Sequence, residues 1–228
     1  MKNTILTICI IAATTMLFTT CGDGAPNETS SPNETTTANK TSISDLEVSI
    51  GTQVWMKENL NVDHFRNGDP IPQAKTAEEW KKAGENKQPA CCYYENNAEN
   101  GKTYGLLYNW YAVNDARGLA PQGYHIPTDA EWTTLKAYLG RKAVTKMKST
   151  SGWNKNCNGT DSSGFNGLPG GHRFTNGTFY DVGENGFWWS STKVNTTNAW
   201  FHGLNCYGGE ISGRYDKGGG LSVRCLRD

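Results

Sequence analysis

The sequence predicts a turn-rich α+β domain behind an amino-terminal leader and linker. The chain of 228 residues contains 26 glycines and 11% aromatic residues, a composition typical of many turns and short strands. Two segments carry the residue spacing of capped helix starts, and an Asn-Gly pair marks a β-hairpin near the carboxyl end. Once the leader is removed, the rest of the chain is long enough for one domain with its own core.

Residues 1–20 have the pattern of a secretory signal, because Lys2 is the only charge before an apolar run that ends at Phe18. The run is too short for a membrane span, which needs about 20 apolar residues. Cys21 follows it, as in bacterial lipoproteins, whose cysteine becomes the acylated first residue. Phe18 and Thr20 depart from the commonest lipoprotein pattern, so an ordinary signal peptide that leaves Cys21 in the tail is the alternative.

Residues 21–45 predict a lipidated cysteine followed by a disordered linker. This segment consists mostly of Ser, Thr, Asn, Pro, Gly and acidic residues and contains no aromatic residue. Such a composition cannot bury a core, and a linker of this length spans about 25 to 30 Å. We therefore expect a head, residues 46–228, held outside the cytoplasm on the outer membrane or cell surface by a lipid anchor.

The head begins with a predicted hairpin, formed by two short apolar strands at residues 48–50 and 54–56. Helices are expected after residues 76–79 and 128–131, because both segments have the Thr-x-x-Glu spacing of a capping box. Gly140 supplies the stop signal of the second helix. Between them, residues 104–113 are apolar on nearly every side, which fits a buried helix or a buried strand, and we expect a helix.

The last third of the chain predicts sheet and loops. Asn176-Gly177 separates two short strands and is a strong hairpin signal. Later strands are expected at residues 200–204 and 221–226. In the final strand, alternation of side chains places Cys225 on the inner face.

Charge and motifs exclude several function classes. Basic and acidic residues balance at 22 each, so the chain has no field that would attract nucleic acid. Its four histidines are scattered without zinc-ligand spacing, and it has neither a Gly-x-Ser-x-Gly elbow nor a phosphate loop. His125 fits a packed residue at a helix start better than a catalyst. We expect no catalytic residue, metal or cofactor, and an unrecognised hydrolase is the lesser alternative.

Six segments of the head occur in an order that resembles a known family: residues 50–62, 104–113, 123–132, 163–171, 187–192 and 222–228. Together they resemble the Fibrobacter succinogenes major paralogous domain over residues 46–228. That family is similar to the C-type-lectin-like fold shared with formylglycine-generating enzymes. The resemblance implies an α+β fold in which two main helices pack on short irregular antiparallel sheets with long loops.

The chemistry of those relatives does not carry over to this chain. Formylglycine-generating enzymes use two closely spaced cysteines, whereas Cys225 lies 19 residues after Cys206. True C-type lectins hold calcium with a Glu-Pro-Asn or Gln-Pro-Asp loop, but here Gln88-Pro89 is followed by Ala90. The resemblance therefore implies a fold and no mechanism, and we expect no calcium site.

The resemblance also implies a disulfide. The head contains Cys91, Cys92, Cys157, Cys206 and Cys225, an odd number that leaves at least one thiol free. Related sequences that share the Cys-Tyr-Tyr block beginning at Cys92 usually carry the terminal Val-Arg-Cys, which implies a bond between Cys92 and Cys225. Cys157 with Cys206 is the second candidate pair.

The function we expect is a non-catalytic binding module on a lipoprotein, for glycans or another extracellular polymer. The alternative is a structural or protein-interaction protein of the envelope, with no small-ligand site. Trp55, Trp132 and Trp153 are expected in the core. The candidate ligand residues are Trp188, Tyr207 and Arg214. Trp188 is chosen because Phe187 and Trp189 share the opposite strand face, and the other two flank glycine turns in the loop-rich region.

Overall fold

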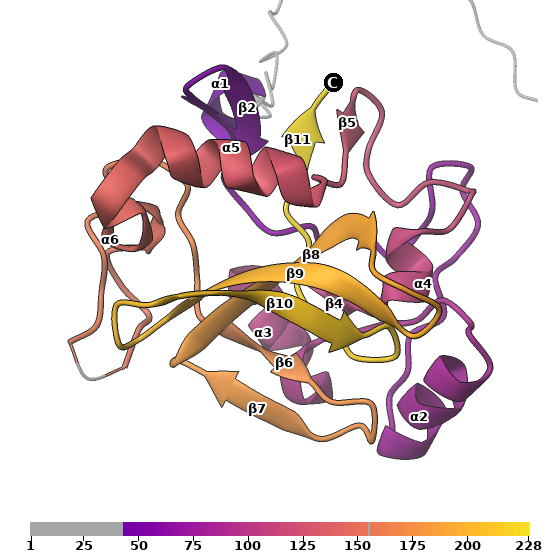
Figure 1. The fold of residues 1–228 in the computed structure, drawn as a ribbon. Coiled ribbons are helices and arrows are strands. Elements are labelled where there is room, and N and C mark those ends of the chain that lie inside the picture. Colours follow the sequence, from indigo (N-terminus) through magenta and orange to yellow (C-terminus); the bar gives the residue numbers. More distant parts are fainter. Residues whose placement is uncertain (1–42, 155) are drawn as a thin grey trace, which may run out of the picture. The chain divides into compact units, whose positions relative to one another are not determined.

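The computed structural model describes residues 43–154 and 156–228, and Figure 1 labels its elements. The helices are α1 (Ile43–Leu46), α2 (Ala77–Glu85), α3 (Ala98–Tyr104), α4 (Trp110–Val113), α5 (Asp129–Leu139) and α6 (Ala143–Met147), with the short 3-10 helices η1 (Tyr94–Asn96) and η2 (Gly140–Lys142). The strands are β1 (Glu47–Ile50), β2 (Gln53–Met56), β3 (Cys91–Cys92), β4 (Leu107–Tyr108), β5 (Tyr124–His125), β6 (Gly170–Arg173), β7 (Phe179–Val182), β8 (Asn185–Lys193), β9 (Asn198–Asn205), β10 (Glu210–Asp216) and β11 (Leu226–Arg227). Few helices and several curled sheets agree with the expected α+β class. The leader, Cys21 and nearly all of the linker lie outside the described residues.

A four-stranded sheet in the order β1-β2-β11-β5 joins the two ends of the head (Figure 1). The predicted β1–β2 hairpin is confirmed, with Val48 paired to Trp55 and a turn at Gly51, whose φ of 63° favours glycine. The carboxyl-terminal strand β11 lies between β2 and β5, because Leu226 pairs with both Trp55 and His125.

A five-stranded sheet in the order β10-β9-β8-β6-β7 forms the other main layer. The hairpin around Asn176-Gly177 is confirmed as β6 and β7. The sheet curls strongly. The rings of His172 on β6 and Tyr215 on β10 have centroids 5.8 Å apart, whereas three strand spacings in a flat sheet amount to about 14 Å. One face of this sheet is therefore concave.

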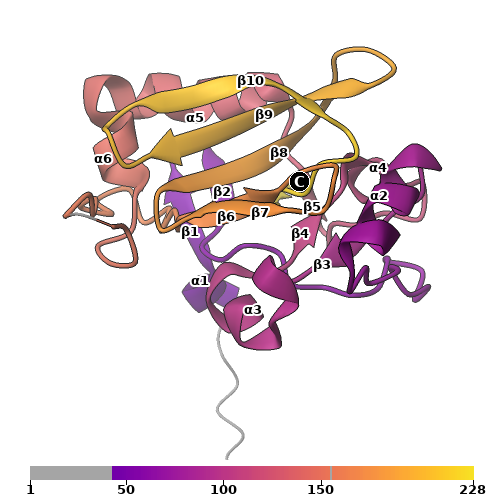
Figure 2. The ribbon, with the colours of Figure 1, turned by 90° about the horizontal axis from the view of Figure 1, so that it is seen from below.

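Helix α5 lies across the other face of β8 and β9, and Figure 2 shows the sheet from the side turned away from α5. Both capping boxes are confirmed. The hydroxyl of Thr76 accepts from the backbone of Glu79, and Thr128 and Glu131 are arranged in the same way. Gly140 follows α5 with a φ of 68° and ends the helix, as predicted.

The core contains the predicted tryptophans. Trp55, Trp132 and Trp153 are buried in one cluster beneath α5, and the ring of Trp132 packs at 4.8 Å from Trp55. Trp188 belongs to the same cluster and is only 1% exposed, so the expectation of an outward ring is wrong. The alternation was correct, since Phe187 and Trp189 do face the other way. However, α5 covers the face that Trp188 occupies.

Residues 104–113 do not form the expected single helix. Helix α3 ends at Tyr104, and Gly105 follows with a φ of 72°. Leu107 and Tyr108 then pair with β3, and the side chain of Asn109 accepts from the backbone of Ala112 to begin α4. Nearly all of the segment is apolar because β4 and α4 are both buried, so its hydrophobic pattern did not reveal the break.

The final stretch is buried but mostly not a regular strand. Only Leu226 and Arg227 form β11, although Leu221, Val223 and Cys225 lie in one core cluster, as the alternation predicted. The intervening residues are buried too. Arg224 donates to the Asn59 side chain at 2.8 Å and to the backbone carbonyl of Phe165, so its charge is solvated by protein oxygens.

The disulfide links Cys157 to Cys206, the second of the two candidate pairs, with their Cα atoms 5.1 Å apart. The pair of Cys92 with Cys225 is wrong, because both of these thiols are free and buried. Adjacent residues of β3 point to opposite faces. Cys91 therefore shares the cluster of Cys225, whereas Cys92 packs in a different cluster around Trp80.

Candidate functional site: an aromatic cleft

The concave face of the five-stranded sheet carries aromatic rings opposite glycines. Across β8, β9 and β10, Phe187 pairs with Gly203, and Phe201 pairs with Gly213. A Cβ atom on Gly203 would lie 2.8 Å from the Phe187 ring, closer than side chains tolerate. The glycines therefore let the phenylalanine rings lie across the neighbouring strand instead of standing upright.

Six rings meet on this face, and we call the group the aromatic cleft: His172, Phe174, Tyr180, Phe187, Phe201 and Tyr215. His172 is the centre of the group, because its ring lies 5.1 to 5.9 Å from four of the others. Most pairs meet edge to face, a geometry that stabilises aromatic contacts.

The cleft encloses about 130 Å³, lined by four of these rings and by Leu221 at its base. Phe174 and Tyr180 lie beside the lining residues, with their rings against His172, and we call them the rim. Their surfaces are 43% and 45% exposed. These two exposed rings extend the aromatic surface of the hollow toward solvent.

Two polar atoms in the cleft lack a hydrogen-bond partner. They are Nδ1 of His172, a residue only 6% exposed, and the hydroxyl of Tyr215. The nearest carboxylate, Oδ2 of Asp181, is 3.5 Å from Nδ1 and does not satisfy it with a hydrogen bond. Buried polar groups in proteins are normally paired, so two neighbouring orphans need an explanation.

Both polar groups are neutral at neutral pH. Burial lowers the pKa of His172, and the opposing effect of Asp181 is smaller. Burial, followed by the charges of Asp216 and Asp181, raises the pKa of Tyr215, so its hydroxyl keeps its proton. The cleft thus combines an apolar surface with two buried, neutral polar groups, an imidazole nitrogen and a phenol hydroxyl.

Arg173 anchors the hairpin that carries the rim. Its guanidinium is fully buried and lies over the rings of Trp80 and Phe179, at 4.9 and 4.6 Å. It donates to the carbonyls of Ala74 and Thr76, at 3.0 and 2.9 Å. Because Thr76 caps α2, these contacts join the hairpin β6–β7 to the start of that helix.

The three residues expected to bind ligand do not come together. Trp188 is buried under α5, Tyr207 is 80% exposed in the turn between β9 and β10, and Arg214 is exposed near the other end of β10. Arg214 lies over the ring of Trp200, with which it pairs, on the face opposite Tyr215. Neither exposed residue belongs to the aromatic cleft.

The three residues expected from sequence lie in the same third of the chain as the aromatic cleft, but none of them is one of its six rings. The signal that could have found the cleft is the spacing Phe201-x-Gly203 and Gly213-x-Tyr215 on two strands of one hairpin. Once those strands are paired, each phenylalanine ring faces a glycine across the sheet. The alternation alone could not show which face α5 would cover.

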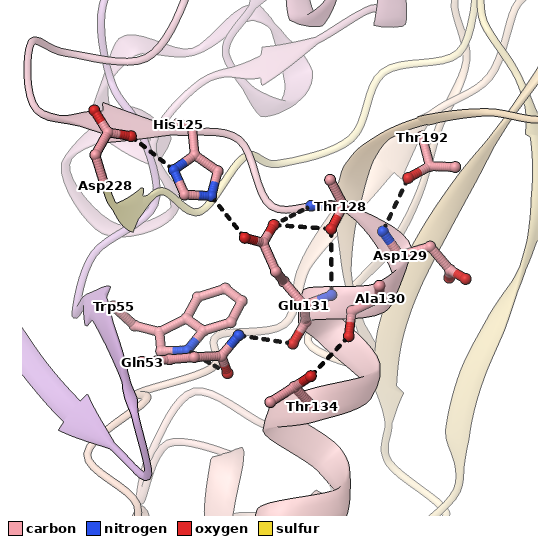
Figure 3. A network of polar contacts seen from close by, with 10 residues as sticks. All are labelled: Gln53, Trp55, His125, Thr128, Asp129, Ala130, Glu131, Thr134, Thr192 and Asp228. Carbon is pink, nitrogen blue, oxygen red and sulfur yellow. Dashed lines mark hydrogen bonds and ion pairs between the residues drawn. The ribbon is translucent and has the colours of Figure 1, made fainter.

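A second polar cluster lies at the start of α5 (Figure 3). His125 contacts Asp228 through Nδ1 at 2.8 Å and Glu131 through Nε2 at 3.0 Å. Glu131 also accepts from the backbone of Thr128 as part of the capping box. As expected for a helix-start residue, His125 has both ring nitrogens engaged in joining α5 to the carboxyl-terminal residue.

In residues 43–154 and 156–228, no group of three or more His, Cys, Asp or Glu side chains is placed to hold a metal ion. Within the same part of the chain, no helix is long and apolar enough to cross a membrane.

The curled sheet, the helix on one face and the aromatic cleft on the other define a mixed α+β domain. Residues 48–227 match the Fibrobacter succinogenes major domain, and the chain belongs to that family, as its sequence blocks implied. No protein of curated function matches the chain.

Proposed function

We propose that this protein is a lipid-anchored envelope protein whose head is a non-catalytic module that binds extracellular glycans. The observation that carries the proposal is the aromatic cleft. Its exposed rim rings can stack on the apolar face of a sugar, and its buried polar pair can bond to sugar substituents. The leader and Cys21 support attachment to an envelope membrane.

The non-catalytic role is supported by how the described histidines are used. His125 is held between two carboxylates, and His202 contacts Asp129 at 2.9 Å and Lys136 at 3.2 Å. In these contacts both imidazoles are held by charged side chains, which differs from the pairing of a base with a nucleophilic hydroxyl or thiol. Within this proposal the head has a C-type-lectin-like fold, supported by the sequence resemblance and by a curled sheet with α5 packed on one face.

The test is a binding screen of the full chain, purified in detergent micelles, against insoluble polysaccharides and soluble oligosaccharides. At least one glycan should bind, and Tyr180→Ala should weaken its binding about tenfold, because truncating an aromatic anchor typically costs that much. Tyr138→Ala is the matched control, since Tyr138 is 66% exposed on α5, which covers the opposite face. Tyr207→Ala tests the separate residue expected from sequence.

Three results would contradict the proposal. An envelope protein without a ligand site would bind no polymer in the screen. If the glycan bound through another surface, Tyr180→Ala would weaken binding no more than Tyr138→Ala. A hydrolase would release reducing sugar ends during the incubation, which the same samples report.

A further inference from the structure

We infer that the floor of the aromatic cleft accepts an acetamido group, so that the glycan bound there is N-acetylated. This inference rests on the proposed function and narrows its ligand class. It starts from a hollow lined by four rings and Leu221, in which two of the lining residues each carry a buried polar atom without a hydrogen-bond partner: Nδ1 of His172 and the hydroxyl of Tyr215.

An acetamido group matches the hollow in its number of polar atoms and in its apolar part. It has a methyl group, one N–H donor and one carbonyl acceptor. The rings of Phe187 and Phe201 and the side chain of Leu221 provide an apolar surface for the methyl. A phenol both donates and accepts, and a neutral imidazole nitrogen does either one according to its tautomer. The two orphan atoms can therefore satisfy both polar atoms of the group, and be satisfied by them.

Other ligand chemistries fit the cleft less well. A carboxylate or sulfate would meet the nearby carboxylates of Asp181 and Asp216, which already influence Tyr215. A quaternary ammonium would suit the rings but would leave both orphan polar atoms unpaired. An unsubstituted sugar carries several hydroxyls that two polar atoms cannot satisfy. The ligand chemistry that fits best is therefore a neutral group with one hydrogen-bond donor, one acceptor and a methyl group.

Access to the floor passes Phe174. Its ring packs beside both polar residues, 5.1 Å from the ring of His172 and 6.0 Å from that of Tyr215, whose two orphan polar atoms have almost no accessible surface. The ring is nearly half exposed and follows the last residue of β6, where side-chain rotation takes only picoseconds to nanoseconds. Rotation of Phe174 outward would uncover the pair and leave the ring beside the entering sugar.

The experiment compares two oligosaccharides that differ only at carbon 2. Chitohexaose carries an acetamido group there, and cellohexaose carries a hydroxyl on the same β-1,4 backbone. Binding to the full chain is measured by calorimetry. Chitohexaose should bind at least about tenfold more tightly, because buried groups built for a partner discriminate against a ligand that lacks it. Fully deacetylated chitosan hexamer should bind as weakly as cellohexaose.

Tyr215→Phe tests the polar pair directly. It should weaken chitohexaose binding about tenfold and leave cellohexaose binding unchanged, because only the hydroxyl is removed. Tyr138→Phe, which removes an exposed hydroxyl on α5, should change neither. Thermal unfolding of each variant shows whether the fold is intact. Tetramethylammonium chloride, added as a competitor, should not displace chitohexaose.

The outcomes separate the two proposals. Equal binding of chitohexaose and cellohexaose, unchanged chitohexaose binding in Tyr215→Phe, or displacement by tetramethylammonium would each overturn the acetamido site. If a glycan still bound through Tyr180 in those cases, the proposed function would stand. If no glycan bound at all, both would fall.

Discussion

At the scale of single residues, the cleft stands out because two of its buried polar atoms lack a hydrogen-bond partner. Among the described residues, the other buried side-chain polar atoms without a partner are Nε1 of Trp80 and Nε1 of Trp132, each within a separate apolar cluster. Each indole is a single N–H donor without an acceptor, packed inside a core. By contrast, His172 and Tyr215 share a hollow, which is the arrangement that a ligand can complete.

Tyr215→Phe should leave the free protein as stable as before or raise its unfolding free energy by up to about 1 kcal/mol, since it removes an unsatisfied buried hydroxyl. The matched control is Tyr108→Phe. The Tyr108 hydroxyl donates to the carbonyl of Val62 at 2.7 Å and accepts from its N–H at 2.8 Å. Loss of that hydroxyl should cost about 1 to 3 kcal/mol. Urea unfolding measures both, and a Tyr215 variant that lost as much as the Tyr108 variant would show that its hydroxyl is already satisfied.

At the scale of elements, local signals predicted what local chemistry controls. The two capping boxes and the Asn176-Gly177 turn are each specified by a few adjacent residues, and all three formed as expected. The prediction of one helix over residues 104–113 was wrong, because most of these residues are buried and the periodicity that separates helix from strand is lost. The cleft was not predicted for a related reason. Its rings come from β6 to β10, and their meeting depends on the curl of the whole sheet.

The cluster at the start of α5 should make stability depend on pH. Burial opposes the charged form of His125, but hydrogen bonds to Asp228 and Glu131 outweigh it and raise the pKa of His125. A raised pKa means that the stabilisation is complete below about pH 6.5 and is lost as pH rises through the folded-state value. For Glu131, burial is outweighed by hydrogen bonds from Thr128 and His125, which lower its pKa. Its contribution is present above its ordinary value and is lost in acid.

The chain should therefore be more stable relative to His125→Asn at pH 5.5 than at pH 8.5. The difference should be under about 1 kcal/mol, because the contacts are partly exposed. Urea midpoints at the two pH values measure it. His64→Asn is the control. The ion pair of His64 is with its sequence neighbour Asp63, so it does not connect distant parts of the chain as the contacts of His125 do. A His125 variant whose deficit grew as pH rose would reverse the sign and refute the assignment.

The disulfide joins the loop after α6 to the turn between β9 and β10. It closes a sequence separation of 49 residues, for which the chain-entropy model gives about 4 kcal/mol. Serine at both Cys157 and Cys206 should lower the unfolding free energy by about 2 to 4 kcal/mol. Cys92→Ser is the comparison. The resemblance implied a bond at Cys92, but its thiol is free and buried, so this substitution removes no disulfide. Mass analysis of the non-reduced chain after proteolysis would contradict this assignment if it recovered a peptide linking Cys92 to Cys225.

At the scale of the whole molecule, the five-stranded sheet divides two environments. One face packs against α5 and contributes Trp188 to a closed core. The other combines core packing around Trp189 with the open cleft. The composition already indicated many rings and turns, but the division between buried and exposed rings depends on which face a distant helix covers. A prediction for Trp188 could therefore not be settled from its own strand.

The anchor is the last feature of the whole chain and is predicted from sequence alone. If Cys21 is acylated, it becomes the first residue of the mature protein and carries two or three acyl chains, which hold a protein stably on a membrane where one chain does not. The full chain, expressed in a bacterium grown with an alkyne-labelled fatty acid, should take up the label and sediment with membranes. Cys21→Ala should take up no label and should leave the membrane pellet or retain its leader. Cys91→Ala is the control, because Cys91 is buried in the head and its loss should not affect labelling. Mass spectrometry that found a free Cys21 thiol in the mature chain would show that the leader is an ordinary signal peptide, and the head would then reach its ligand as a secreted protein.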